Sequence, residues 1–96
     1  MSPDGRFWLT YQPDGNLILY RWDSVALWWM LTTHVPGHTV MQTDGNLVVY
    51  DVNGTVIWNS GTWGNTGAYL RLQNNGNMVI VNSAGVVIWQ SGTGNY

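Results

Sequence analysis

A nine-residue phrase occurs three times in this chain and constrains its fold more than any other feature. It reads QPDGNLILY at residues 12–20, QTDGNLVVY at 42–50 and QNNGNMVIV at 73–81. In a β-strand every second side chain lies on the same face. In the first two copies the alternate residues are Gln, Asp, Asn, an aliphatic residue and Tyr. Such a polar set is unsuited to a core, so we expect three related binding sites or the remnants of them.

The repeat extends over the whole chain with a period of 30 to 31 residues. Trp28, Trp58 and Trp89 follow the three phrases at the same spacing. Self-similarity at a fixed period predicts a repeat architecture, and alternation of apolar and polar residues predicts strands rather than helices. Asp-Gly and Asn-Gly pairs predict tight hairpins. We therefore expect one all-β domain, residues 1–96, with repeats at about 2–32, 33–62 and 63–96 and three small antiparallel sheets around a pseudo-threefold axis.

The alternation separates an inner face from an outer face. The tryptophan of each repeat is predicted to pack near the axis, where equivalent large aromatics fill a small symmetric core. The outer face carries the polar residues of the phrase. The aliphatic residues predicted for the inner face are Leu17, Leu19, Leu47, Val49, Met78 and Ile80.

Composition excludes several classes of function. The chain has no cysteine, a net charge of −2, and three arginines but no lysine, so it lacks the basic stripe that nucleic-acid binding requires. No apolar run approaches the roughly 20 residues that span a bilayer, which excludes membrane insertion. His34 and His38 have no second ligand at a suitable spacing, so we expect no metal, no cofactor and no catalytic histidine. The amino terminus, MSPDGRF, lacks the features of a signal peptide, so any export signal is not part of this sequence.

The polar set of the phrase is suited to a sugar. Gln, Asp, Asn and Tyr offer carboxylate and amide acceptors, amide donors and a phenolic hydroxyl, which complement vicinal hydroxyl groups. The aliphatic residue among them offers a contact for a C–H face. The only formal charge is negative, which disfavours a phosphate. The alternative is that Asp14 and Asn16 are only turn residues, but this explains neither Gln12 nor Tyr20.

The phrase resembles the QxDxNxVxY signature of the bulb-type (monocot) mannose-binding lectins. The match covers nearly the whole chain, with three copies in register. The resemblance implies a β-prism of three four-stranded sheets and metal-free binding of mannose-containing glycans. It also implies a further short strand at the start of the chain, which is absent here. Closure is then expected to rely on residues 90–96, either in place or exchanged with a partner chain.

The resemblance assigns a role to each residue of the second copy. Asp44 and Asn46 would bind the axial 2-hydroxyl of mannose, Gln42 the 3-hydroxyl and Tyr50 the 4-hydroxyl, while Val48 would pack on the carbon face of the sugar. The matching residues of the first copy are Gln12, Asp14, Asn16, Ile18 and Tyr20. The degenerate third copy has Gln73, Asn75, Asn77 and Val79, with Val81 in place of Tyr, and we expect it to bind weakly or not at all.

The first repeat departs from the other two in its apolar residues. After the shared tryptophan, repeat 2 reads Asn-Ser-Gly and repeat 3 reads Gln-Ser-Gly, whereas repeat 1 reads Trp-Met-Leu. A contiguous exposed apolar patch on a soluble domain is usually an interface. The candidate interface residues are Trp8, Trp22, Trp29, Met30 and Leu31.

Three interpretations of this patch remain open from the sequence. The residues could fold inward or cover the gap left by the missing first strand, they could form a homodimer interface, or they could bind a different protein. A contrast confined to one repeat is also typical of an engineered binding surface on a lectin scaffold.

The sequence therefore favours a non-catalytic mannose-binding module, secreted or extracellular if natural. The alternative is a protein-binding module on the same scaffold. An enzyme is disfavoured because Asp14 and Asp44 belong to different predicted sheets, so a glycosidase pair of carboxylates is not expected.

Overall fold

The computed structural model describes residues 1–30 and 35–94, and these residues form three antiparallel sheets of three strands each. Sheet 1 contains β1 (Phe7–Tyr11), β2 (Leu17–Arg21) and β3 (Ala26–Met30). Sheet 2 contains β4 (Pro36–Met41), β5 (Leu47–Asp51) and β6 (Val56–Asn59). Sheet 3 contains β7 (Tyr69–Leu72), β8 (Met78–Val81) and β9 (Val87–Gln90). The strands follow chain order within each sheet, and the middle strand is β2, β5 or β8.

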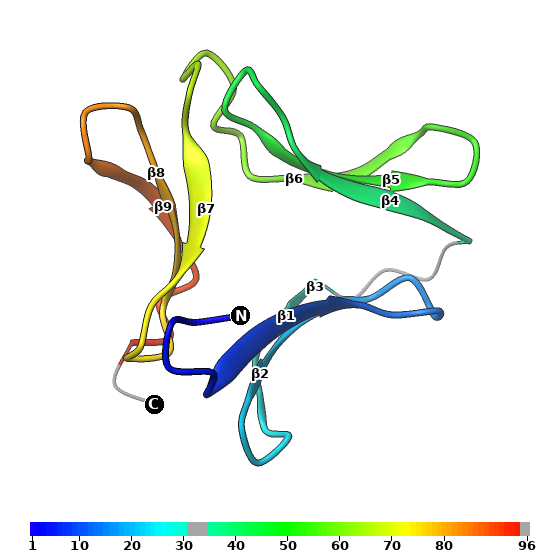
Figure 1. Cartoon of the computed structure of the whole chain (residues 1–96). Helices are drawn as coiled ribbons and strands as arrows, with labels where there is room; N and C mark the ends of the chain where they lie inside the picture. Colours follow the sequence, from blue (N-terminus) through cyan, green and yellow to red (C-terminus); the bar gives the residue numbers. More distant parts are fainter. Residues whose placement is uncertain (31–34, 95–96) are drawn as a thin grey trace.

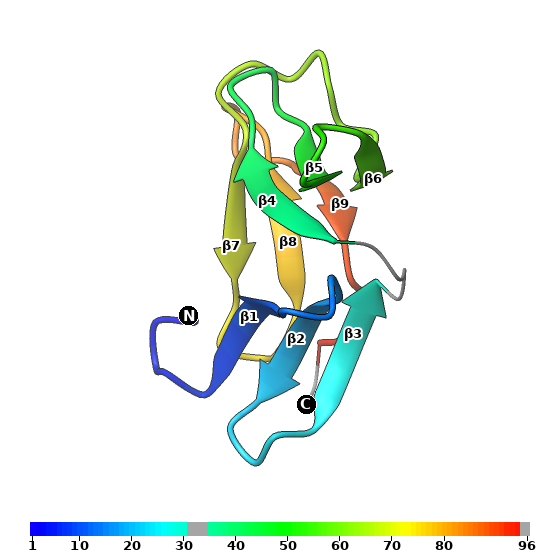
Figure 2. The same ribbon diagram turned by 90° about the vertical axis from the view of Figure 1, so that its right-hand side faces the viewer.

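The three sheets form the sides of a short prism (Figures 1 and 2). Its extents are 36 × 33 × 17 Å. This confirms the expected all-β fold of three antiparallel sheets. The four-stranded sheets implied by the resemblance are not found in the described part of the chain. Between β6 and β7, for example, residues 60–68 form turns rather than a fourth strand.

The axis of the prism is filled by the three equivalent tryptophans, as predicted. The ring centroids of Trp28, Trp58 and Trp89 lie 5.5 to 5.8 Å apart in edge-to-face pairs. Edge-to-face contact is a favoured geometry for aromatic pairs. One such ring from each sheet therefore holds the three sheets together at the centre.

The inner faces also match the prediction from alternation. The aliphatic residues predicted for that face are at most 1% exposed: Leu17, Leu19, Leu47, Val49, Met78 and Ile80. They divide into three clusters, each joining two sheets; Leu17 and Val49 join sheets 1 and 2, for example.

Sheets 1 and 3 are joined by the segment that precedes β1. The Asp4 backbone N–H donates to Asn74 Oδ1 (3.1 Å), and Arg6 Nη2 donates to the Asn74 carbonyl (2.5 Å). The Phe7 ring packs against Gly76, where a Cβ atom would lie 3.0 Å from the ring. The tail, as far as it is described, bonds within sheet 3, where Thr93 Oγ1 donates to the Gly76 carbonyl (2.7 Å).

Candidate functional site

Each polar set lies on the outer face of its sheet, at the hairpin between the first and second strands. We name these sets site 1, site 2 and site 3. Site 1 consists of Gln12, Asp14, Asn16, Ile18 and Tyr20; site 2 of Gln42, Asp44, Asn46, Val48 and Tyr50; and site 3 of Gln73, Asn75, Asn77 and Val79, with Val81 at the position of the tyrosine.

The hairpin turn of site 2 fixes the position of Asp44. The Gln42 N–H donates to the Asn46 carbonyl (2.9 Å), and Asp44 Oδ1 accepts from the Asn46 N–H (3.0 Å). Gly45 takes φ +92°, and a Cβ there would lie 2.3 Å from the carbonyl oxygen of Asn65. Asp44 thus uses one carboxylate oxygen for the turn, as a turn residue does, while the other has no partner in the described part of the chain.

Only the carbonyl oxygen of the Asn46 side chain is hydrogen-bonded by the described residues. Its Oδ1 accepts from the Ser60 hydroxyl (3.1 Å) and from the Thr62 N–H (3.2 Å). The Ser60 hydroxyl in turn accepts from the N–H of Leu47 (3.0 Å). The Asn46 Nδ2 group has no partner among the described residues, although the residue is only 8% exposed. Site 2 therefore presents an oriented amide donor whose carbonyl oxygen is already bonded.

Gln42 and Tyr50 form a bridge over Val48. Gln42 Nε2 donates to the Tyr50 hydroxyl, which leaves the phenolic proton available for another acceptor. In the strand register the bond passes over the pair formed by Val40 and Val48. Val48 lies on the outer face as predicted but is only 2% exposed, so it forms a covered floor rather than an open apolar surface.

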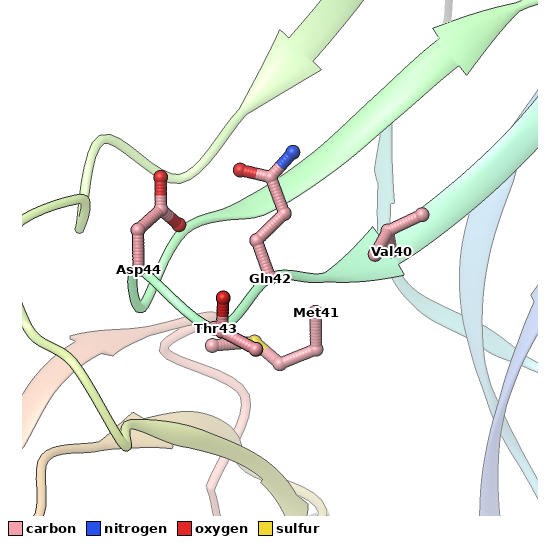
Figure 3. A pocket seen from close by; sticks show the side chains of 5 residues that line it. All are labelled: Val40, Met41, Gln42, Thr43 and Asp44. Atoms are coloured by element: carbon pink, nitrogen blue, oxygen red, sulfur yellow. The ribbon is translucent and has the colours of Figure 1, made fainter.

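A cavity of about 520 Å³ opens beside site 2. Figure 3 shows its lining residues, with the polar groups of Gln42 and Asp44 projecting to the same side of the chain. The other lining residues are Val40, Met41 and Thr43. Its volume is within the usual range of about 300–1,000 Å³ for small-ligand sites, and Val40 contributes the half-buried apolar wall.

Site 1 has the same polar residues but a different bonding pattern. Its amide group is turned toward the acid, because Asn16 Nδ2 donates to Asp14 Oδ2 (3.2 Å). The Gln12 amide donates to the Tyr20 hydroxyl (2.7 Å), as in site 2. On the β3 side the wall is Trp29, which pairs with Ile18 where Asn59 pairs with Val48.

Site 3 lacks the carboxylate and the phenol of site 2, and the side-chain amide of Asn77 is already hydrogen-bonded within the chain. Asn77 Nδ2 donates to Gln90 Oε1 (3.0 Å), and Asn77 Oδ1 is held by Ser91 and Thr93, as Asn46 is held in site 2. Val81 has no hydroxyl with which Gln73 could bond. The amide donor that is available in site 2 is therefore occupied in site 3.

The apolar patch predicted on repeat 1 is only partly present. Trp22 and Trp29 are 62% and 51% exposed, and Trp8 is half-buried with its ring centroid 6.3 Å from that of Tyr20. Met30 was wrongly assigned to this patch. It is 5% exposed and pairs with Leu17 on the inner face, because strand alternation turns it inward when Trp29 points outward. Leu31 and His34 lie outside the described residues.

The charges near the sites are few. The pKa of Asp23 is lowered, chiefly by hydrogen bonds from the Arg21 side chain. For Asp4, partial desolvation raises the pKa, but hydrogen bonds from the backbone and side chain of Arg6 outweigh it and the pKa falls below its ordinary value. Asp14 and Asp44 form no ion pair with any described residue.

Some classes of site are not found in the described part of the chain. No group of three or more metal-ligating side chains occurs among residues 1–30 and 35–94. The same residues contain no helix long and apolar enough to cross a membrane.

Two functional features were missed by reasoning from the sequence. One is the support of Asn46 by Ser60 and Thr62, for which the signal was the recurrence of Ser-Gly-Thr after the tryptophan in repeats 2 and 3. The other is Val40, whose place in the cavity wall follows from its position two residues before Gln42 on the same face.

Comparison of the structure with solved structures finds close relatives. A lectin from Marasmius oreades has a TM-score of 0.91 and 34% sequence identity, with 99% of this chain and 80% of that chain covered. A monomeric monocot mannose-binding lectin from Gastrodia elata has a TM-score of 0.84 and 36% identity over 94% of this chain and 83% of that one. The mannose-specific agglutinin of snowdrop (Galanthus nivalis), complexed with methyl α-D-mannoside, has a TM-score of 0.73 and 39% identity over 93% and 81%. No protein-family model and no curated protein sequence matches the chain.

Proposed function

Because the chain belongs to the family of bulb-type (monocot) mannose-binding lectins, we propose that it is a non-catalytic module that binds mannose through site 2. The observation that carries this proposal is the state of Asn46. Its carbonyl oxygen is held by Ser60 and Thr62, and its Nδ2 group is left without a partner in the described part of the chain. An oriented donor of this kind loses little freedom when a hydroxyl group binds.

The groups of site 2 form a complementary set for the hydroxyls of one sugar ring. The free oxygen of Asp44 accepts and Asn46 Nδ2 donates at the axial 2-hydroxyl, while Gln42 serves the 3-hydroxyl. The Tyr50 hydroxyl, already an acceptor toward Gln42, donates to the 4-hydroxyl. We expect an equatorial 2-hydroxyl to miss Asp44, so a glucoside should bind more weakly than a mannoside.

The apolar contact for the sugar is divided between two residues in this proposal. Val48 is the floor beneath the bridge formed by Gln42 and Tyr50, and it is 2% exposed. Val40 lines the open cavity and offers the accessible methyl groups. The carbon face of the ring is therefore expected to contact Val40 first.

The three sites are proposed to be unequal. Site 1 keeps the polar set, but its amide donor must leave Asp14 Oδ2 before it can bind a sugar, so we expect it to be weaker than site 2. Site 3 lacks the acid and the phenol and is expected not to bind mannose. One shallow polar site is expected to bind with a dissociation constant near the millimolar range, so useful avidity requires several sites or several chains.

Calorimetric titration with methyl α-D-mannoside tests the proposal. We expect weak binding in which Asp44→Ala removes the stronger, site 2 component and Tyr50→Phe weakens it, while the matched change in site 3, Asn75→Ala, has no effect. The corresponding glucoside should bind more weakly. Equal loss of affinity in the site 2 and site 3 variants would show that site 2 is not the binding site.

A protein-binding function remains a second candidate because Trp22 and Trp29 are largely exposed. Exposed tryptophans are favoured anchors at interfaces, although the burial of Met30 reduces the apolar area that such a surface would offer. If this function holds, changing Trp29 to Asn, the residue of repeat 2, should abolish self-association or partner binding and leave mannoside binding at site 2 intact. If the wild-type chain is monomeric and, like the variant, binds no protein partner, the protein-binding function is excluded and only the sugar-binding proposal stands.

A further inference from the structure

Site 3 differs from site 2 in charge as well as in hydroxyl-binding groups. Val40, Gln42 and Asp44 are the lining residues of the site 2 cavity that share the outer face. With the offset of 31 residues, their counterparts in sheet 3 are Arg71, Gln73 and Asn75. The formal charge of this trio is −1 in site 2 and +1 in site 3. A neutral aliphatic residue has been replaced by a guanidinium at the same place where the acid has been replaced by an amide.

The guanidinium of Arg71 is available to a ligand. Arg71 lies on β7 opposite Val79 in the strand register, at the centre of the outer face, and its side chain is exposed. It forms no hydrogen bond or ion pair with any described residue. The other two arginines are each paired with a carboxylate, Arg6 with Asp4 at 2.5 Å and Arg21 with Asp23 at 2.7 Å.

The groups around Arg71 are neutral and include amide donors. The side chain of Gln73 is not bridged to a tyrosine, because Val81 stands at that position. The Oδ1 atom of Asn75 accepts from the Asn77 N–H (3.0 Å), which leaves its NH₂ group for a ligand. Tyr69 pairs with Val81 at the far end of the same face and is 47% exposed. Among the described residues, site 3 thus combines one cation, two amides and an exposed aromatic ring, and no carboxylate.

From this arrangement we propose that site 3 binds a sugar that carries an anionic substituent, a carboxylate or a phosphate, with Arg71 as the specificity-determining residue. The planar guanidinium bonds such groups through two parallel N–H groups, the amides bond the neighbouring hydroxyls, and the Tyr69 ring packs on the C–H face of the sugar. The inference rests on the proposed function only in treating the outer face as sugar-binding. It does not require that site 2 bind mannose.

The alternative is that Arg71 only covers Val79, which is 1% exposed. An arginine stem does cover apolar surface while its charged end stays in water. In that case the charge at position 71 would have no effect on any sugar ligand, and the two readings give different binding results.

Titration followed by nuclear magnetic resonance separates these readings. The probes are methyl α-D-mannoside, mannose-6-phosphate and glucuronate, each added to the wild-type chain, to Arg71→Thr and to the matched control Arg21→Thr. The control removes the same charge from sheet 1. We expect the two anionic sugars to shift resonances of sheet 3, and Arg71→Thr to weaken that binding about fivefold, the upper end for one exposed ion pair.

The same titrations identify the anionic group and keep the two proposals apart. A stronger response to glucuronate than to mannose-6-phosphate assigns a carboxylate ligand, and the reverse assigns a phosphate. Arg71→Thr should leave the mannoside titration of sheet 2 unchanged. If methyl α-D-mannoside does not bind to sheet 2 while the anionic sugars still bind to sheet 3, that result would contradict the proposed function and not this inference. No shift in sheet 3 with either anionic sugar, or equal weakening by Arg71→Thr and Arg21→Thr, would overturn the inference.

Discussion

Removing the Ser60 hydroxyl should weaken sugar binding at site 2 through Asn46 without removing any group that touches the sugar. In the wild-type chain this hydroxyl accepts from the Leu47 N–H (3.0 Å) and shares its proton between Asn46 Oδ1 (3.1 Å) and Thr62 Oγ1 (2.7 Å), because the Thr62 hydroxyl donates to the Gly45 carbonyl. In Ser60→Ala, Asn46 Oδ1 keeps only the Thr62 N–H (3.2 Å). The amide is then less well oriented, and its oxygen can compete with Nδ2 for the place that faces the ligand.

The magnitudes follow from these bonds. One neutral hydrogen bond contributes about 0.5–1.5 kcal/mol, so its loss from the support of Asn46 predicts about a twofold to tenfold weaker affinity for methyl α-D-mannoside. The stability also falls, because Leu47 is 1% exposed and its N–H loses its partner. An orphaned buried donor costs about 1–3 kcal/mol, and each kcal/mol lowers the melting temperature of a domain of this size by about 4–8 °C.

Repeat 3 supplies a matched control in Ser91→Ala. Ser91 accepts from the Met78 N–H (3.0 Å) and donates to Asn77 Oδ1 (3.3 Å), as Ser60 does in repeat 2. We expect the same loss in denaturant unfolding experiments and no change in mannoside affinity by calorimetry. The reasoning is refuted if both variants lose affinity equally, or if Ser60→Ala is destabilised but binds as tightly as the wild type.

Four further substitutions test the account of the fold. Thr39→Val should raise the free energy of unfolding by about 1 kcal/mol, because the Thr39 hydroxyl is buried without a hydrogen-bond partner among the described residues; denaturant melts that show destabilisation would contradict this. Ser24→Gly should stabilise by about 0.5–1 kcal/mol in the same assay, since Ser24 takes φ +68° where repeat 2 has Gly54. Gly45→Ala should cost at least about 2 kcal/mol, because its Cβ would lie 2.3 Å from the Asn65 carbonyl oxygen. Gly54→Ala, with a similar φ of +81° and open space around the Cβ, should cost only about 1 kcal/mol, and equal losses would exclude the clash as the cause.

The inner face and the axis could be predicted because both follow from short-range rules. Alternation assigns Leu47 and Val49 to one face, and the structure buries both almost completely. Because the tryptophans recur with the period of the repeat, they occupy equivalent positions in the three sheets. A small core with threefold symmetry has room for three large rings only at its centre. These rules need only the order of residues along a strand.

Met30 shows how the same rule was misapplied. The comparison of repeats treated Trp29, Met30 and Leu31 as one apolar block because each replaces a polar or small residue. In a strand, neighbours in the chain point to opposite faces, so Trp29 is 51% exposed and Met30 is in the core. The extra apolar residue extends β3 to Met30, whereas β6 ends at Asn59, just before Ser60.

The state of the amide donor at each site could not be predicted from the phrase itself. All three copies contain the asparagine, and in each its N–H bonds the side chain two residues earlier. The difference arises elsewhere. Asn77 Nδ2 is bonded to Gln90, which lies 13 residues further along the chain, whereas repeat 2 has Asn59 at that place, and the Asn59 side chain instead accepts from the Gly61 N–H. A difference of one methylene group in the length of the side chain on the third strand therefore decides whether the donor faces a ligand. It follows that Gln90→Asn should free the Asn77 donor, and that this change alone should not create a mannose site, because site 3 still lacks the acid and the phenol.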